Sequence, residues 1–196
     1  MKSIELASAV RIESWSGPQL AARMHEAMDI YVQAMNYPSS AGSQRAVTAT
    51  QHTRNAGFAC RAALHPDGTL LGFAYGYTTA AGQWWHDLVR RALPRDLGHD
   101  WLRDAFELSE MHVLPRYQGL GIGRRILTAL ASNIPHRAML LSTPDADTRA
   151  FRLYRSMGFV DLARDYLFPG DARPFAVLGA KLPLRIDDTP DHARGR

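Results

Sequence analysis

The sequence predicts a mixed α/β fold, in which strands and helices alternate along a single domain. Apolar residues alternate in short segments such as 69–77, where Leu71 and Phe73 share one side of a predicted strand. Other segments repeat apolar residues every three or four positions, which is typical of helices that cover a sheet. Residues 113–123 form a glycine-rich turn that joins a predicted strand to a predicted helix. These three patterns together predict a sheet with helices packed on its faces.

The composition is typical of a soluble globular protein. With 196 residues, the chain is long enough for one domain with a full core, which we place at residues 1–184. No apolar run approaches the length that crosses a bilayer, and the N-terminus lacks the apolar core of a signal peptide, so we expect a cytoplasmic protein without membrane contact. The single cysteine, Cys60, excludes an internal disulfide, and its place in a predicted strand indicates a buried thiol.

The formal net charge is +4, and nearly all of the basic residues are arginine. Such an excess attracts anionic ligands or nucleic acid. Acidic residues are interspersed with the basic ones along the chain, so a nucleic-acid surface is disfavoured.

The first half of the chain predicts a strand, two helices and a hairpin. A strand at 9–15 is followed by Ser16, Gly17 and Pro18, which mark a helix start. One face of that helix carries an apolar stripe, which is Leu20, Met24, Met28, Tyr31 and Met35. Next come a loop at 36–43, a weaker helix at 44–55, and a hairpin with strands at 58–64 and 69–77. The connection that follows, 80–104, is less regular and contains one short helical piece.

The second half predicts three further strands and two helices after the strand that ends at Val113. The helix after the glycine turn opens at Ile122 or Gly123, and a strand follows at 137–142. A polar loop at 143–147 leads to a helix that ends before Gly158. Strands at 159–168 and 174–182 complete the order, and the polar tail 185–196 is predicted to be disordered.

The strand before the glycine turn contains a slip in its alternation. Phe106 and Leu108 are apolar at even positions, whereas Met111 and Val113 are apolar at odd positions. One extra residue near Ser109 and Glu110, a β-bulge, keeps all four apolar side chains on one face. The same bulge places Glu107 and His112, with Glu110 as a further candidate, on the opposite face.

The glycine-rich turn itself is suited to hold a phosphate. Gly119, Gly121 and Gly123 leave backbone N–H groups uncovered at a helix start, where unpaired donors carry a partial positive charge. Arg124 and Arg125 add two cations. A pattern of three alternate glycines is common in ordinary turns, so this signal alone has low specificity.

The order of elements and two motifs resemble the GNAT superfamily of N-acetyltransferases. Residues 113–123 (VLPRYQGLGIG) are similar to the family's acetyl-coenzyme A signature, and residues 149–159 (RAFRLYRSMGF) are similar to its alanine, leucine-tyrosine and glycine-phenylalanine helix. The resemblance implies a central, mostly antiparallel, twisted sheet of six to seven strands with helices on both faces and a β-bulge in the fourth strand. It implies acetyl transfer from acetyl-coenzyme A to an amine by direct transfer in a ternary complex, with no metal.

The resemblance also assigns roles to residues. Tyr154 becomes the general acid toward the leaving thiolate, whereas the residues alone favour a core tyrosine. Asp147 stands where the family often has asparagine and joins the coenzyme site. The coenzyme-binding set that the resemblance implies is Met111, His112, Val113, Gln118, Gly119, Leu120, Gly121, Ile122, Gly123, Arg124, Asp147 and Tyr154.

The general base has several candidates. Glu107 lies eleven residues before Gln118, where some family members carry a catalytic glutamate, and we rank it first. Glu110 is second, and His112 is a further candidate, because histidine is the side chain that most readily exchanges a proton near neutral pH. An ordered water that takes the proton is a further route. The alternative without any catalytic role is that all three side chains are solvated residues on one face of the strand.

The acceptor side carries no recognised motif. Tyr31, Tyr75, Tyr77, Trp84 and Trp85 are the candidate substrate-binding residues. An aromatic wall of this kind favours a small amine or a peptide N-terminus over a highly cationic aminoglycoside. A non-catalytic acyl-coenzyme A sensor is the alternative function, because these motifs encode coenzyme binding more directly than turnover. The sequence is compatible with a homodimer as well as with a monomer.

Overall fold

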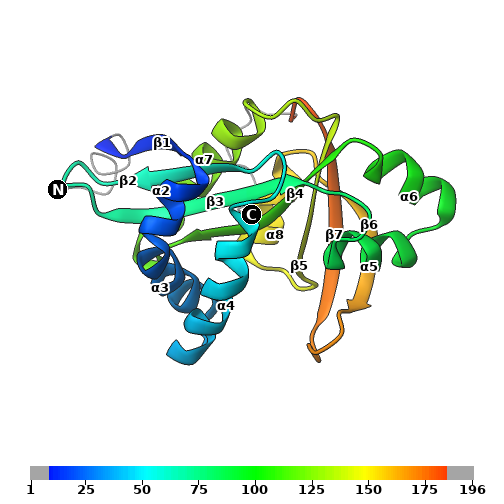
Figure 1. Ribbon diagram of the computed structural model, residues 1–196, viewed down its shortest axis with the longest axis horizontal. Coiled ribbons are helices and arrows are strands. Elements are labelled where there is room, and N and C mark those ends of the chain that lie inside the picture. The colour runs from blue at the N-terminus through cyan, green and yellow to red at the C-terminus, as the bar shows by residue number, and fades with distance from the viewer. Residues whose placement is uncertain (1–8, 185–196) are drawn as a thin grey trace, which may run out of the picture.

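A computed structural model describes residues 9–184 of the chain. They form a seven-stranded sheet in the order β1-β2-β3-β4-β5-β7-β6, with helices on both faces (Figure 1). The strands are β1 (Arg11–Trp15), β2 (Ala59–Leu64), β3 (Leu70–Thr78), β4 (Ala105–Val113), β5 (Ala138–Pro144), β6 (Val160–Leu167) and β7 (Pro174–Lys181). The helices are α2 (Gly17–Ala22), α3 (Met24–Met35), α4 (Ser39–His52), α5 (Trp84–Ala92), α6 (Arg95–Leu102), the 3₁₀ turn η1 (Pro115–Tyr117), α7 (Ile122–Ala131) and α8 (Arg149–Ser156).

The sheet is antiparallel except where β4 meets β5. These two strands pair in parallel over Ala105–Glu107 and Ala138–Leu140, and the described pairing ends there. Figure 1 shows β1 to β3 running across one side of the molecule and β6 and β7 running at a steep angle to them on the other side. The sheet therefore divides between β4 and β5 beyond Glu107.

Helices α3 and α7 cover opposite faces of the sheet beside β4. A side-chain carbon added at Gly123 of α7 would lie 3.2 Å from Met111 Cε, so Met111 faces α7. The next residue, His112, stacks edge-on against Tyr31 of α3, with ring centroids 5.2 Å apart. Successive residues of a strand point to opposite faces, which places the two helices on opposite sides. Ile122, Ile126 and Leu130 of α7 belong to the main core, as the predicted amphipathic pattern requires.

The β-bulge predicted in the fourth strand is present. Tyr75 pairs with Glu110 and Gly76 pairs with Leu108, so Ser109 is the extra residue that has no partner on β3. As a result, Phe106, Leu108, Met111 and Val113 belong to or pack against the main core, and Glu107, Glu110 and His112 face the helix layer that contains α3 and α4.

Two predictions for the N-terminal half were wrong. The loop expected at 36–43 ends early, because α4 begins at Ser39, immediately after Pro38 in an extended conformation. The same helix ends at His52, before Asn55.

The connection at 80–104 is more regular than predicted. It forms two helices, α5 and α6, separated at Pro94. Trp85 and Val89 lie four residues apart and are buried in a second apolar cluster with Leu140 and Val177. Helices of nine and eight residues are too short to show a clear helical period in the sequence.

The tail predicted to be disordered, 185–196, lies outside the described residues. Within residues 9–184, no helix combines the length and the apolar character needed to cross a bilayer.

Candidate active site

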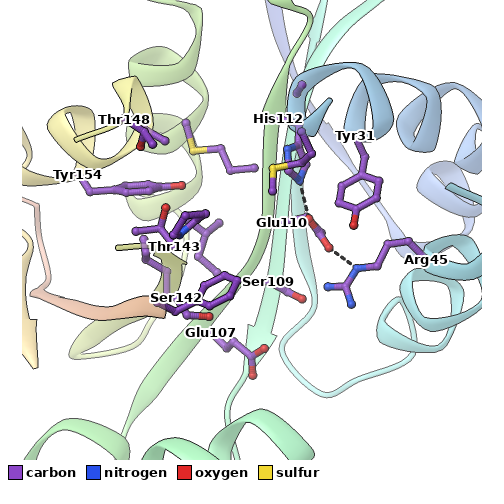
Figure 2. A pocket seen from close by; sticks show the side chains of 18 of the residues that line it. Tyr31, Arg45, Glu107, Ser109, Glu110, His112, Ser142, Thr143, Thr148 and Tyr154 are labelled. Carbon is purple, nitrogen blue, oxygen red and sulfur yellow. Dashed lines mark hydrogen bonds and ion pairs between the residues drawn. The ribbon is translucent and has the colours of Figure 1, made fainter. Parts of the chain in front are cut away.

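A cleft of about 2000 Å³ crosses the sheet where β4 and β5 separate. Its floor is the stretch Glu107–Val113 of β4, and its walls come from α3 and α4 on one side and from the end of β5, α8 and the β6–β7 loop on the other. Figure 2 shows Tyr154 and Thr148 approaching from one side of β4 and Tyr31 and Arg45 from the other. The cleft therefore has two halves, one beside the glycine turn and one beside α3 and α4.

The glycine turn shapes the first half. Gly119 and Gly121 have φ values of 78° and 76°, a left-handed conformation that glycine adopts without strain, and no atom lies within 4 Å of a side-chain carbon added at either. The Gln118 side chain donates to Val113 O at 3.0 Å and ties the turn to the end of β4. The Arg125 N–H donates to Gly121 O at 3.1 Å, which is the first backbone hydrogen bond of α7. The N–H groups that come before it in the first turn have no acceptor within the helix. Open space beside these donors suits an anionic phosphate.

Most of the predicted coenzyme-binding residues line the cleft, and His112 does so in its other half, against Tyr31 of α3. The ones that line it are Met111, His112, Val113, Gln118, Gly119, Gly121, Gly123, Arg124 and Tyr154. Ile122 is 1% exposed and belongs to the main core, and Leu120 packs against that core. Their side chains lie away from the cleft, while their backbone belongs to the turn.

Asp147 lies outside the cleft. Its carboxylate pairs with Arg152 at 2.7 Å, and its side chain is 80% exposed. Helix α8 is capped by the next residue, because Thr148 Oγ1 accepts from Phe151 N at 3.0 Å.

Tyr154 reaches the cleft from α8. The residue is 6% exposed, and its ring packs 5.5 Å from that of Phe159. Its hydroxyl has no hydrogen-bond partner among the described residues and points toward the centre of the cleft (Figure 2). Burial, with the negative charge of Glu110, raises the pKa of this phenol, so it keeps its proton at neutral pH. It is placed to donate a proton into the cleft.

Glu107 is buried on the opposite side of β4. One carboxylate oxygen, Oε1, accepts from the Tyr77 hydroxyl at 3.0 Å. The other, Oε2, is inaccessible to solvent and has no hydrogen-bond partner among the described residues. Burial raises the pKa of Glu107 to about 7, against the opposing effect of the Tyr77 hydrogen bond. A carboxyl group with this pKa exchanges a proton readily at neutral pH.

Glu110 has a different environment from Glu107. It forms an ion pair with Arg45 of α4 through one oxygen and a hydrogen bond with His112 through the other (Figure 2). Burial alone would raise the pKa of Glu110, but Arg45 and His112 outweigh it and lower that pKa to about 2. Glu110 therefore stays ionised at neutral pH.

Four of the five predicted aromatic substrate residues line the cleft. They are Tyr31, Tyr77, Trp84 and Trp85. Trp84 is 59% exposed at the edge, and Trp85 is buried with its indole N–H bonded to Ser142 Oγ at 3.0 Å. The fifth, Tyr75, is fully buried in the core behind the cleft wall.

Three cleft residues escaped the sequence analysis. Arg45 and His52 come from α4, and Arg173 comes from the β6–β7 loop, where it lies over the Tyr37 ring at 5.2 Å. Arg45 and His52 are seven residues apart, a spacing that places both on one face of a helix. That spacing was the available signal, although nothing local indicated that this face meets β4.

Among the described residues, no group of three or more histidine, cysteine, aspartate or glutamate side chains is arranged to hold a metal ion. The chemistry that this geometry supports is proton exchange by Glu107 and Tyr154 on the two sides of a strand, next to a site for an anionic group.

Comparisons with known proteins agree with this geometry. Residues 63–161 match the Acetyltransferase (GNAT) domain family. The chain is 37% identical over 191 residues to a GCN5-like protein acetyltransferase of Mycobacterium tuberculosis, which covers 83% of this chain and 93% of that protein.

Solved structures share the fold. One is a GNAT-family acetyltransferase from Desulfovibrio desulfuricans, with a TM-score of 0.63 and 17% identity over 88% of this chain and 99% of that chain. Another is the acetyltransferase yncA from Salmonella typhimurium, solved with acetyl-coenzyme A, with a TM-score of 0.60 and 16% identity over 93% of this chain and 98% of that chain.

Proposed function

This chain belongs to the GNAT superfamily of acetyltransferases, and we propose that it transfers an acetyl group from acetyl-coenzyme A to a primary amine by direct transfer in a ternary complex. The observation that carries the proposal is the placement of Glu107 and Tyr154 on opposite sides of the bulged strand, in one cleft with the glycine turn. Bound acetyl-coenzyme A would supply an activated thioester.

The glycine turn and the start of α7 would hold the pyrophosphate. The left-handed glycines at 119 and 121 keep the approach to the backbone N–H groups open, and Arg124 adds a cation at the cleft. A side chain at either glycine would occupy part of that approach. The fit rests on the chain's own donors and requires no metal.

The bulge would orient the acyl end of the coenzyme. Because β4 turns away from β5 beyond Glu107, the backbone near Met111 and Val113 lies at the cleft without a β5 partner. Main-chain groups of these residues are the proposed contacts of the pantetheine arm and the acyl carbonyl.

Glu107 is the proposed general base. An amine must lose its proton before it attacks, and a carboxylate with a pKa of about 7 accepts that proton near neutral pH. Glu110 is a poor candidate, because its ion pair with Arg45 keeps it unprotonated. Glu110 is instead a fixed charge that holds α4 against β4.

Tyr154 is the proposed general acid. Its hydroxyl faces the cleft, and its raised pKa keeps the proton in place until the sulfur leaves as a thiolate. No other tyrosine of α8 competes for this role, since Tyr154 is the helix's single tyrosine.

An amine of a peptide or protein is the proposed acceptor. The support is the relative that is 37% identical and is named a protein acetyltransferase. The aromatic edge of the cleft at Trp84 is also exposed, where an extended acceptor could lie.

Two peptide series test the acceptor. One has a free N-terminus and blocked lysines, and the other has a blocked N-terminus and free lysines. Acetylation of either series, read by mass spectrometry, supports the proposal and identifies the amine. If free coenzyme A appears at the same rate with and without peptide, the peptide or protein acceptor is refuted.

A further inference from the structure

Glu107 presents a difficulty for its role as a base. The residue is 4% exposed, Oε2 is inaccessible, and Oε1 is already occupied by the Tyr77 hydroxyl. An amine bound in the cleft therefore does not reach Oε2 directly in this conformation, and at Oε1 it would share the oxygen with the Tyr77 hydroxyl. The more exposed groups that line the cleft beside Glu107 offer the proton another route.

A chain of hydrogen-bonding groups connects Glu107 to the cleft. Tyr77 Oη lies 3.0 Å from Glu107 Oε1 and 3.5 Å from His52 Nε2. On the other side of the imidazole, His52 Nδ1 lies 3.3 Å from Ser109 Oγ and 3.2 Å from Tyr75 Oη. Ser109, His52 and Tyr77 all line the cleft. Figure 2 shows Ser109 on the edge of β4 between Glu107 and Glu110.

We propose that Ser109, His52 and Tyr77 form a proton relay that delivers the proton of the acceptor amine to Glu107. The proposal rests on the assignment of Glu107 as the base. It makes Ser109 the group that meets the amine, directly or through one water, and makes His52 and Tyr77 relay residues that act through Glu107.

The direction of hydrogen-bond donation along the chain fits this transfer. An ionised Glu107 only accepts, so Tyr77 must donate to it. The lone pair of Tyr77 Oη is then free to accept from the Nε2–H of a neutral His52. Nδ1 of that tautomer accepts from the Ser109 hydroxyl. Every donor therefore points from the cleft toward Glu107.

The transfer balances along the same chain. A proton that Ser109 Oγ receives from the amine releases the hydroxyl's own proton to His52 Nδ1. The Nε2 proton passes to Tyr77 Oη, and the Tyr77 proton passes to Glu107 Oε1. The amine, Ser109 and Tyr77 end neutral, His52 ends as the Nδ1–H tautomer, and Glu107 ends as a carboxylic acid.

The charges around the relay keep His52 in the neutral form that this transfer needs. Arg45 on α4 and Glu110 on β4 are the charged groups near the imidazole, and Tyr75 and Tyr77 on β3 are the titratable groups that contact it. Burial and then the positive charge of Arg45 lower the pKa of His52 to about 4. A neutral imidazole has one donor and one acceptor, which is the arrangement that a relay requires.

The bulge explains why Ser109 takes part. As the extra residue of β4 it has no partner on β3, and its hydroxyl turns toward the end of α4. In a regular strand the adjacent side chains of Ser109 and Glu110 would point to opposite faces, whereas here both face α4.

The test compares turnover and pH dependence in four variants with a peptide acceptor of the wild-type enzyme. Glu107→Gln, Tyr77→Phe and His52→Gln each break the relay, and His52→Gln keeps an amide that can hold Tyr77 without conducting a proton. His25→Gln, on the exposed face of α3, is the matched histidine control. We expect each break to lower kcat about 100-fold and to abolish the acidic limb of kcat/KM near pH 7, with acetyl-coenzyme A affinity unchanged.

The double variant His52→Gln/Glu107→Gln separates a relay from two independent effects. Members of one relay act as a unit, so the double variant should be no slower than Glu107→Gln alone within about twofold. If the loss of kcat in the double variant equals the product of the losses in the two single variants, the relay is overturned. A His52→Gln enzyme that keeps the limb and merely shifts it would also overturn it, because it would show that His52 only positions Tyr77.

The same data distinguish this inference from the proposed base. If Glu107→Gln retains wild-type kcat, the base assignment fails and the relay fails with it. If Glu107→Gln is slow while both His52→Gln and Tyr77→Phe are fast, the base stands and the relay alone is refuted. Tyr77→Phe is an independent break should His52→Gln fail to fold.

Discussion

Arg45 on α4 forms an ion pair with Glu110 on β4, and His112 occupies the other oxygen of the same carboxylate. Glu107, three residues away on the same strand, has one oxygen without a partner. The two carboxyl groups therefore have pKa values displaced in opposite directions, to about 2 for Glu110 and about 7 for Glu107. Pairs displaced in this way commonly have separate roles in catalysis.

Arg45→Met should destabilise the fold by about 3 kcal/mol, because it leaves the buried Glu110 charge with His112 alone. Urea unfolding at pH 7 measures the change. The double variant Arg45→Met/Glu110→Gln should recover most of the loss, since it removes the uncompensated charge as well. If the losses of unfolding free energy in the two single variants add up to the loss in the double variant, Arg45 and Glu110 do not interact as described.

Glu110 should stabilise the protein in a specific pH range. Its folded pKa is lowered to about 2 from an ordinary value of 4.5, so its stabilisation is present above pH 4.5 and is lost as the pH falls toward 2. Urea unfolding of wild type and Glu110→Gln at pH 6 and pH 3 should show a difference that shrinks at the lower pH. A constant difference would contradict the lowered pKa.

Glu107 should behave in the opposite sense. Its raised pKa means that the folded state favours the protonated form, so a cost appears as the pH rises above 4.5 and is complete above about pH 7. Glu107→Gln removes that cost and should be more stable than wild type at pH 8, by up to about 3 kcal/mol, but not at pH 4. Glu13→Gln on β1, where the side chain is 40% exposed, is the control. Equal stabilisation at both pH values would refute the assignment.

Tyr154→Phe should lower kcat about 100-fold while the affinity for acetyl-coenzyme A stays near that of wild type. The substitution removes only the hydroxyl that faces the cleft, and the ring still packs against Phe159. Tyr166→Phe on β6, whose hydroxyl bonds to Leu88 O, is the matched control. Steady-state kinetics and isothermal titration measure the two quantities. Turnover equal to that of the control would remove Tyr154 from the acid role.

Gly121→Ala should weaken coenzyme binding beyond what backbone strain explains. Alanine is strained at a φ of 76°, and its methyl group would enter the open space beside the first turn of α7. Gly68→Ala in the β2–β3 turn introduces the same strain at a φ of 88°, also into open space, away from the cleft. Both variants should lose about 1 kcal/mol of stability, and only Gly121→Ala should lose affinity in titration calorimetry. Equal affinities would refute the phosphate site.

Local patterns predicted the part of the site that lies on β4, α7 and α8. The slip between Leu108 and Met111 predicted a bulge near Ser109 and Glu110, and the structure has Ser109 as the extra residue. The glycine turn and Tyr154 followed from motifs that are contiguous in the sequence.

The acceptor half depended on contacts that no local pattern contains. Arg45 meets Glu110 across 65 residues of sequence, and His52 meets Ser109 across 57. Which face of α4 lies against β4 is decided by tertiary packing, so neither residue stood out. The placement of Tyr75 in the core, with its hydroxyl on His52, has the same origin.

The most direct test of the account is mass spectrometry of amine-bearing peptides after incubation with acetyl-coenzyme A and either wild type or Glu107→Gln at pH 7.5. We expect one added acetyl group, located on an amine nitrogen, at a rate that falls about 100-fold in the variant. Peptides left unmodified throughout both series, or acetyl groups found on hydroxyl oxygens, would contradict it.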